Sequence, residues 1–198
     1  MKRFAATVLV AALPVGMAVL PAGLAAQQQP ETLLSGPVRS GGFGAPVVKF
    51  SQVNDKFAVL VGGRGGWIVN DVFVIGGGGY GLTNQHHLSF DALDMGYGGL
   101  DLEYVNRPHE LVHISLSVLV GGGGVTYFPR NSLVGFNSGF FVAEPAMNIM
   151  VNVTPVFRIG IGGSYRAVEA LSVPELSNRD LSGFSGHVQF KFGKFVGT

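Results

Sequence analysis

Apolar and polar residues alternate with a period of two along most of the chain after residue 46. This alternation is the pattern of a β-strand with one buried face, because successive side chains point to opposite sides of a sheet. The runs that follow it span residues 47–53, 56–69, 72–83, 93–105, 111–128, 140–153, 157–168 and 181–195. Eight such runs, an even number, predict one all-β domain: a single eight-stranded antiparallel up-and-down barrel.

The connections between these runs alternate in length. Short connections fall at 70–71, 106–110 and 154–156, whereas long ones fall at 84–92, 130–139 and 169–180. Only the turn at 54–55 is short on the side where the other connections are long. Short turns at one end and long loops at the other are typical of a transmembrane β-barrel, with the short turns on the periplasmic side.

Each predicted strand has an apolar face, on which aromatic and aliphatic side chains fall at different heights. Aromatic residues are predicted near the two ends of the apolar faces, at Phe57, Trp67, Tyr80, Tyr104, Phe141, Phe157, Tyr165, Phe184 and Phe192. Aliphatic residues lie between them, at Val59, Val61, Leu116, Val118, Ile149, Ile159 and Ile161. Two aromatic belts around an aliphatic band match the interfaces and the core of a bilayer. The sequence therefore predicts a barrel in the cell outer membrane, with membrane lipids as its partners.

The opposite faces carry the charged residues of these runs, which we expect inside the barrel. They form a predicted lumen charge network of Lys49, Arg64, Asp101, Glu103, Glu144, Arg158, Arg166 and Lys191. Buried charges are tolerated when they are paired or hydrogen-bonded. Because eight strands leave an interior that side chains can fill, we expect a plugged polar lumen.

Pro145 lies within the predicted sixth strand, on its outward face. Proline cannot donate a hydrogen bond to the ladder, so it is confined to strand edges and irregular positions. The sequence therefore predicts a β-bulge at Pro145.

The first 46 residues precede the barrel pattern. Residues 1–26 carry two cations, Lys2 and Arg3, then an apolar stretch and a small-residue segment, which together indicate a secretory signal peptide. Residues 27–46 are rich in Gln, Gly, Ser and Pro, and this composition predicts a flexible periplasmic leader. The barrel domain then spans 47–198.

Composition excludes several functional classes. Of the 13 Lys and Arg residues, 11 remain after the predicted cleavage, against 12 acidic residues. A nearly neutral chain offers no electrostatic surface for nucleic acid. The absence of cysteine rules out disulfides, thiolate zinc sites and a thiol nucleophile.

Three segments resemble the small outer-membrane β-barrel proteins, a group that includes the membrane domain of outer membrane protein A and the opacity-type proteins. They are residues 43–50 (FGAPVVKF), 95–104 (MGYGGLDLEY) and 186–192 (GHVQFKF). The resemblance implies an eight-stranded barrel and a last strand that the barrel-assembly machinery recognises. The chain departs from that last pattern, because residues 193–198 continue beyond Phe192.

Motifs that could carry chemistry lack the partners that they need. Residues 76–81 match G-x-G-x-x-G, but no helix follows, so we expect no dinucleotide cofactor. His86 and His87 have no evident third ligand for a metal. His113 and Ser115 resemble the His-x-Ser element of outer-membrane lipid A deacylases, yet they face the lumen and no acidic residue lies between Glu110 and Glu144.

The sequence favours a non-enzymatic outer-membrane barrel with a structural or surface-interaction role, without cofactor or metal. Two alternatives stay open: a lipid A-modifying hydrolase that uses His113 and Ser115, and a narrow channel that uses the lumen charges. The sequence does not identify a surface partner.

Overall fold

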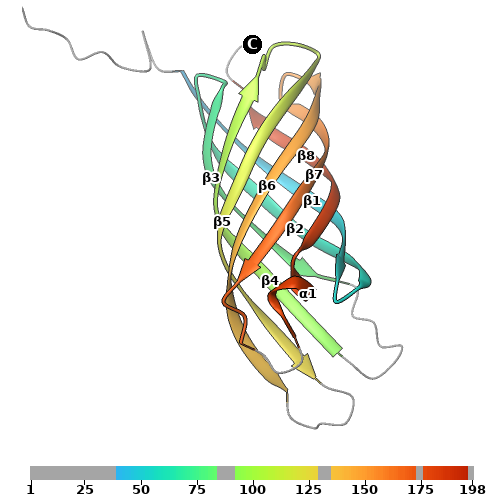
Figure 1. Ribbon diagram of the computed structural model, residues 1–198. Helices are drawn as coiled ribbons and strands as arrows, with labels where there is room; N and C mark the ends of the chain where they lie inside the picture. The colour runs from blue at the N-terminus through green and yellow to red at the C-terminus, as the bar shows by residue number, and fades with distance from the viewer. Residues whose placement is uncertain (1–38, 84–91, 129–134, 173–175, 196–198) are drawn as a thin grey trace, which may run out of the picture. The chain divides into compact units, whose positions relative to one another are not determined.

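The computed structural model of the protein describes residues 39–83, 92–128, 135–172 and 176–195. These residues form a closed barrel in which each strand pairs with the next and β8 pairs with β1 (Figure 1). All pairs are antiparallel, as the sequence predicts. The strands are β1 (Ser40–Val53), β2 (Lys56–Val69), β3 (Phe73–Leu82), β4 (Ala92–Asn106), β5 (Val112–Phe128), β6 (Phe136–Thr154), β7 (Phe157–Glu169) and β8 (Gly183–Lys194), and one helix, α1 (Asn178–Leu181), precedes β8.

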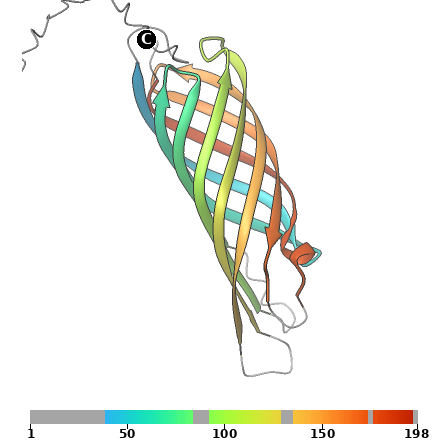
Figure 2. The ribbon, with the colours of Figure 1, turned by 60° about the vertical axis from the view of Figure 1, so that its left-hand side comes forward.

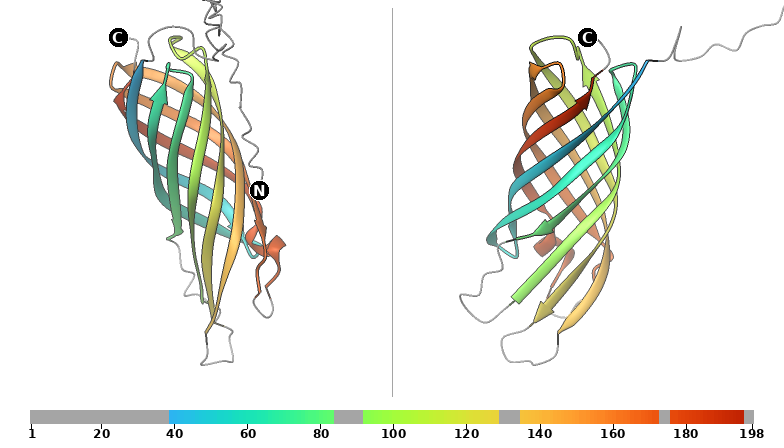
Figure 3. Two further views of the ribbon diagram at one scale, coloured as in Figure 1. Left: turned by 90° about the vertical axis from the view of Figure 1, so that its left-hand side faces the viewer. Right: turned by 180° about the vertical axis from the view of Figure 1, so that it is seen from behind.

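The two ends of the barrel differ in their connections. We call the end where β2–β3, β4–β5 and β6–β7 join the short-turn end, and the opposite end the long-loop end. The strands run obliquely from one end to the other (Figure 3). Asn54 and Asp55 turn β1 into β2, and Asn70 and Asp71 begin the turn from β2 to β3, all with φ between 50° and 63°. Asn and Asp tolerate this left-handed backbone, which matches the twist of a tight hairpin.

The first strand begins at Ser40 rather than at residue 47, so it includes the last part of the predicted leader. Phe43 and Ala45 continue the buried face of Val47. Alternation is hard to read in this segment because glycines at 41, 42 and 44 carry no side chain that marks a face. The predicted signal peptide and the leader up to residue 38 lie outside the described residues.

The predicted bulge at Pro145 is wrong. On the β5 side, the register runs unbroken through the pair Val118 and Pro145. On the β7 side, pairing stops at Pro145 and resumes in the same register. The missing N–H thus interrupts the ladder locally, while the pairs on either side hold the strand in place. The register shift lies instead between Asn152 and Thr154, at the short-turn end.

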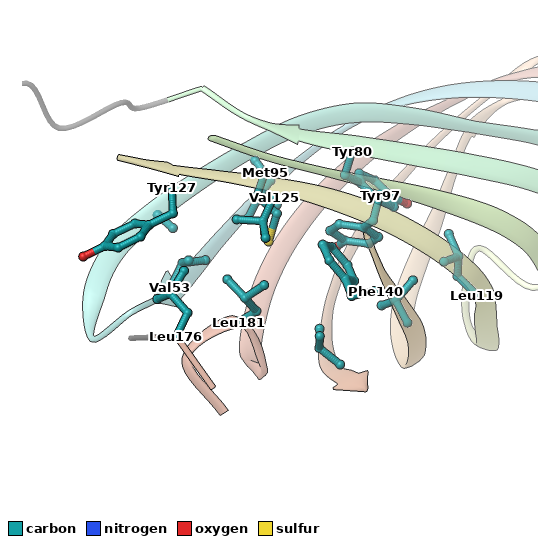
Figure 4. Packing of buried hydrophobic residues seen from close by; sticks show 14 of the residues in the cluster. Val53, Tyr80, Met95, Tyr97, Leu119, Val125, Tyr127, Phe140, Leu176 and Leu181 are labelled. Atoms are coloured by element: carbon teal, nitrogen blue, oxygen red, sulfur yellow. The ribbon is translucent and has the colours of Figure 1, made fainter. Parts of the chain in front are cut away.

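Buried apolar side chains form two layers inside the barrel. A larger layer, here the loop-end layer, extends to the long-loop end and contains Leu60, Met95 and Phe140 among others (Figure 4). A smaller layer, the turn-end layer, is composed of Phe43, Ala45, Ile68, Val74 and Phe195. The charged interior residues described below belong to neither layer.

The described residues just before β8 pack against the long-loop end of the barrel. Leu176 and Leu181 are buried in the loop-end layer, and α1 lies beside the β1–β2 turn (Figure 2). The backbone N–H of Asn54 donates to the carbonyl of Asp180 at 2.6 Å, which ties α1 to that turn. Among the described residues, no helix is long and apolar enough to cross a membrane.

Candidate functional site

The barrel interior is the candidate site, because its charged side chains gather there in two clusters. The first is the Glu103 cluster. Arg64 Nη2 lies 2.6 Å from Asp101 Oδ2 and 3.1 Å from Glu103 Oε2. Lys191 Nζ donates to both oxygens of Glu103 at 2.7 Å. These residues come from β2, β4 and β8, which are far apart in sequence but face one another across the lumen.

The second is the Glu144 cluster, which involves five strands. Lys49 Nζ lies 2.7 Å from Glu144 Oε1, and Ser164 Oγ donates to the same oxygen at 2.6 Å. Tyr97 Oη donates to Glu144 Oε2 at 2.7 Å. Lys49 Nζ also lies 3.4 Å from the centre of the Tyr80 ring, within cation–π range. The carboxylate therefore receives hydrogen bonds at both oxygens, which offsets the cost of removing it from water.

Two interior arginines have no carboxylate in salt-bridge contact within the described part of the chain. Arg166, which is fully buried, donates through Nε to the carbonyl of Leu181 at 2.6 Å and through Nη2 to the carbonyl of Gln52 at 3.3 Å. The guanidinium carbon of Arg158 lies 3.8 Å from the ring centre of Phe195. The excess cations are thus accommodated by backbone carbonyls and by an aromatic face.

Neutral polar side chains occupy the interior beside these clusters. Asn148 Oδ1 lies 2.6 Å from His187 Nε2 and accepts a hydrogen bond from Gln189 Nε2 at 2.9 Å. Asn148 Nδ2 donates to Ser115 Oγ at 3.4 Å. All four side chains are buried on the inward faces of β5, β6 and β8.

The structure places the predicted lumen residues on inward faces. Seven of them are buried and Arg158 is partly buried. Sequence reasoning missed the roles of Asn148, Tyr97 and Ser164 as hydrogen-bond partners. Strand parity could have placed all three inside, but not next to a particular charge.

The predicted place of Tyr80 in an aromatic belt is wrong, because Tyr80 points inward and is only 8% exposed. Four consecutive glycines precede it in β3, so no side chain there marks which face is outward. The inward Gly62 of the neighbouring strand makes room for the ring, since a Cβ at Gly62 would overlap Tyr80.

The other predicted belt residues lie on outward faces, and all of these except the partly buried Phe157 are at least 41% exposed. Cross-strand ring pairs join them to neighbours at both ends. Phe73–Tyr104 and Phe157–Phe192 lie at the short-turn end, and Phe50–Phe57 and Tyr165–Phe184 at the long-loop end. Four further phenylalanines face outward although the sequence did not assign them to the belts: Phe50, Phe73, Phe128 and Phe190.

The motifs considered as chemical sites do not assemble into one in the described residues. His113 Nδ1 lies 3.3 Å from the carbonyl of Glu110, and Ser115 contacts Asn148, so the His113 ring and the Ser115 hydroxyl have separate partners. Residues 76–81 lie within β3, so they form part of an extended strand and not a phosphate-binding loop, and residues 84–91 after it lie outside the described part of the chain. No group of three or more potential ligand residues that could hold a metal occurs in the described part of the chain, and His86 and His87 lie outside it.

No protein-family model and no curated protein sequence matches this chain. Several solved structures are similar to it. The N-terminal β-barrel domain of Pseudomonas aeruginosa OprF covers 78% of this chain and 96% of its own, with 12% identity and a TM-score of 0.53. Neisserial surface protein A is matched over 79% of this chain and 99% of its own length, with 11% identity and a TM-score of 0.57. Ail, the attachment invasion locus protein of Yersinia pestis, is matched over 78% of this chain and 97% of its own length, with 12% identity and a TM-score of 0.53. The chain therefore has the fold of the small eight-stranded outer-membrane β-barrels.

Proposed function

We propose that this protein is an integral outer-membrane barrel with a structural or surface-interaction role. The observation that carries the proposal is the inversion of polarity across the barrel wall. Side chains such as Trp67, Ile149 and Phe184 are more than half exposed on the outside, whereas Glu103, Glu144 and Arg166 are buried inside. In water such an exterior would be costly, but in a bilayer the same surface meets hydrocarbon.

The lumen is proposed to be plugged rather than conductive. In support, the cavity that residues of both clusters line has a volume of only about 20 Å³, and eight strands leave an interior that side chains can fill. The two apolar layers lie toward the two ends of the lumen, where a path for ions would have to enter. Phe195 adds to the layer at the short-turn end.

The protein is further proposed to have no enzymatic activity, with lipids as constant partners and the barrel-assembly machinery as a transient one during insertion. The separate hydrogen-bond partners of His113 and Ser115 argue against the serine hydrolase alternative, because a nucleophilic serine needs the base beside its hydroxyl.

Membrane fractionation together with heat-modifiable migration tests the proposal. We expect the mature chain in the outer-membrane fraction, resistant to extraction by salt or urea, and migrating faster in SDS gels before boiling than after it. Recovery of the folded chain in the soluble fraction without detergent would contradict the membrane assignment.

Two assays then separate the roles. Planar-bilayer recordings are expected to lack discrete conductance steps, and incubation with lipid A is expected to release no fatty acid. Conductance steps would support the channel, whereas fatty acid release that a Ser115→Ala variant abolishes would support the hydrolase.

A further inference from the structure

One interior cavity contacts both charge clusters. It has a volume of about 20 Å³ and is lined by Lys49 and Glu144 from one cluster and by Arg64 and Asp101 from the other. A buried water requires about 10–15 Å³ of such space and two to four polar partners. The cavity therefore has room for a water molecule.

Three side chains that line this cavity have a polar atom without a hydrogen-bond partner among the described residues. These atoms are Arg64 Nε, His187 Nδ1 and Gln189 Oε1. The residues are buried, with 8%, 6% and 1% of their surfaces exposed. A buried polar atom without a partner is destabilising, so a ligand in the cavity that hydrogen-bonds to these three side chains would relieve that cost.

The hydrogen-bonding character of the three atoms identifies that partner. Arg64 Nε–H can only donate, and Gln189 Oε1 can only accept. Asn148 Oδ1 accepts from Gln189 Nε2 and lies 2.6 Å from His187 Nε2, so the hydrogen of that contact belongs to His187 Nε2. The corresponding neutral tautomer leaves Nδ1 as an acceptor.

We propose that this cavity is the site of one structural water, which accepts a hydrogen bond from Arg64 Nε and donates its two hydrogens to His187 Nδ1 and Gln189 Oε1. One donor and two acceptors on the protein are complementary to a water molecule. A metal cation could not accept from the guanidinium, and a simple anion could not donate to two acceptors. Water thus satisfies all three atoms, whereas either kind of ion leaves at least one unsatisfied.

This water joins the Glu103 cluster, through Arg64, to the polar group of Asn148, His187 and Gln189. The cavity borders the loop-end layer, because Val47, Tyr80 and Leu119 line it as well. The site is independent of the proposed cellular role, because it rests on interior geometry alone.

NMR of the full mature chain folded in detergent micelles tests the site directly. We expect cross-peaks between water and Arg64 Nε–H and the Gln189 side-chain amide, with opposite signs in laboratory-frame and rotating-frame Overhauser spectra. Opposite signs indicate a long-lived bound water, whereas chemical exchange of protons gives equal signs. Absence of these cross-peaks in the parent protein overturns the proposal.

Ala146→Val provides the matching variant, because Ala146 lines the cavity, and Ala143→Val on the outward face of β6 is its control. Filling a dry cavity stabilises a protein, whereas displacing a bound water leaves its three partners unsatisfied. We expect Ala146→Val to lose the cross-peaks and to lower the temperature at which gel migration shifts, relative to Ala143→Val. An unchanged or higher temperature contradicts a bound water. Should Ala146→Val fail to fold, the spectra of the parent decide the question.

Discussion

Replacing Glu103 by glutamine would test whether the lumen is truly shielded from water. Glu103 is the shared partner of Arg64 and Lys191, and its side chain is fully buried. Arg64 retains Asp101 at 2.6 Å after the change, but Lys191 loses its carboxylate partner. The perturbation therefore leaves one ammonium group inside the barrel without a compensating charge.

Removing one partner of a buried ion pair costs about 3–5 kcal/mol, because the other charge remains desolvated. We expect Glu103→Gln to lower the free energy of unfolding by about this amount. The exposed pair Arg107–Glu110, 3.3 Å apart with side chains 71% and 55% exposed, provides the control. Glu110→Gln is expected to cost under about 1 kcal/mol, since water screens an exposed pair.

Reversible urea unfolding of the barrel in lipid vesicles, followed by tryptophan fluorescence and gel mobility, measures both changes. The double variant Glu103→Gln with Lys191→Met removes the unpaired ammonium and should recover part of the loss. Equal, small effects of Glu103→Gln and Glu110→Gln would refute the reasoning, because they would show that water reaches Lys191.

Three further outcomes follow from the packing. Gly76→Ala should prevent stable folding, because a Cβ there would overlap the backbone of β2, whereas Gly81→Ala, which meets nothing within 4 Å, should leave heat-modifiable migration unchanged. Leu181→Ala should lower the free energy of unfolding by about 2–5 kcal/mol, the usual cost of truncating a fully buried leucine, as measured in urea. Ile161→Arg should lower the free energy of unfolding in vesicles by about 2–4 kcal/mol, because Ile161 faces outward at mid-depth, whereas Phe184→Arg, near the strand end, should lower it by only about 0–1 kcal/mol. Equal losses would contradict a bilayer centred on Ile161.

Most of the barrel could be predicted because long strands repeat the same two-residue signal many times. In β5, Ile114 and Leu116 mark one face and His113 and Ser115 the other, so the face of each residue follows once the strand is recognised. The tight turn at Asn54 and Asp55 is equally readable, since those residue types accept the left-handed backbone. The alternation along each strand then places the charged side chains inside the barrel, although it does not identify their ion-pair partners.

The wrong predictions fall where the sequence has no alternating side chains that indicate the face of each residue. Glycine runs before Tyr80 and around Phe43 remove the side chains from which a face is inferred. The consequence of Pro145 depends on which neighbour its missing N–H faces, which is a property of the sheet and not of the strand. The inward fold of Leu176 in the β7–β8 connection depends on the space that the barrel mouth leaves, so it too is a tertiary effect.

The arrangement of charge places the proposed surface-interaction role at the ends of the barrel. The outward faces carry exposed apolar side chains along the wall, and six of the inward charged residues are paired with one another, as in Lys49–Glu144 and Lys191–Glu103. A ligand that entered the lumen would have to displace an apolar layer and then break buried ion pairs, whose partners would lose compensation. Binding at the rims disturbs neither the lipid-facing surface nor the interior network. On the proposed surface-interaction role, we therefore expect partner binding to depend on residues at the ends of the barrel, and substitutions inside the lumen to act through stability.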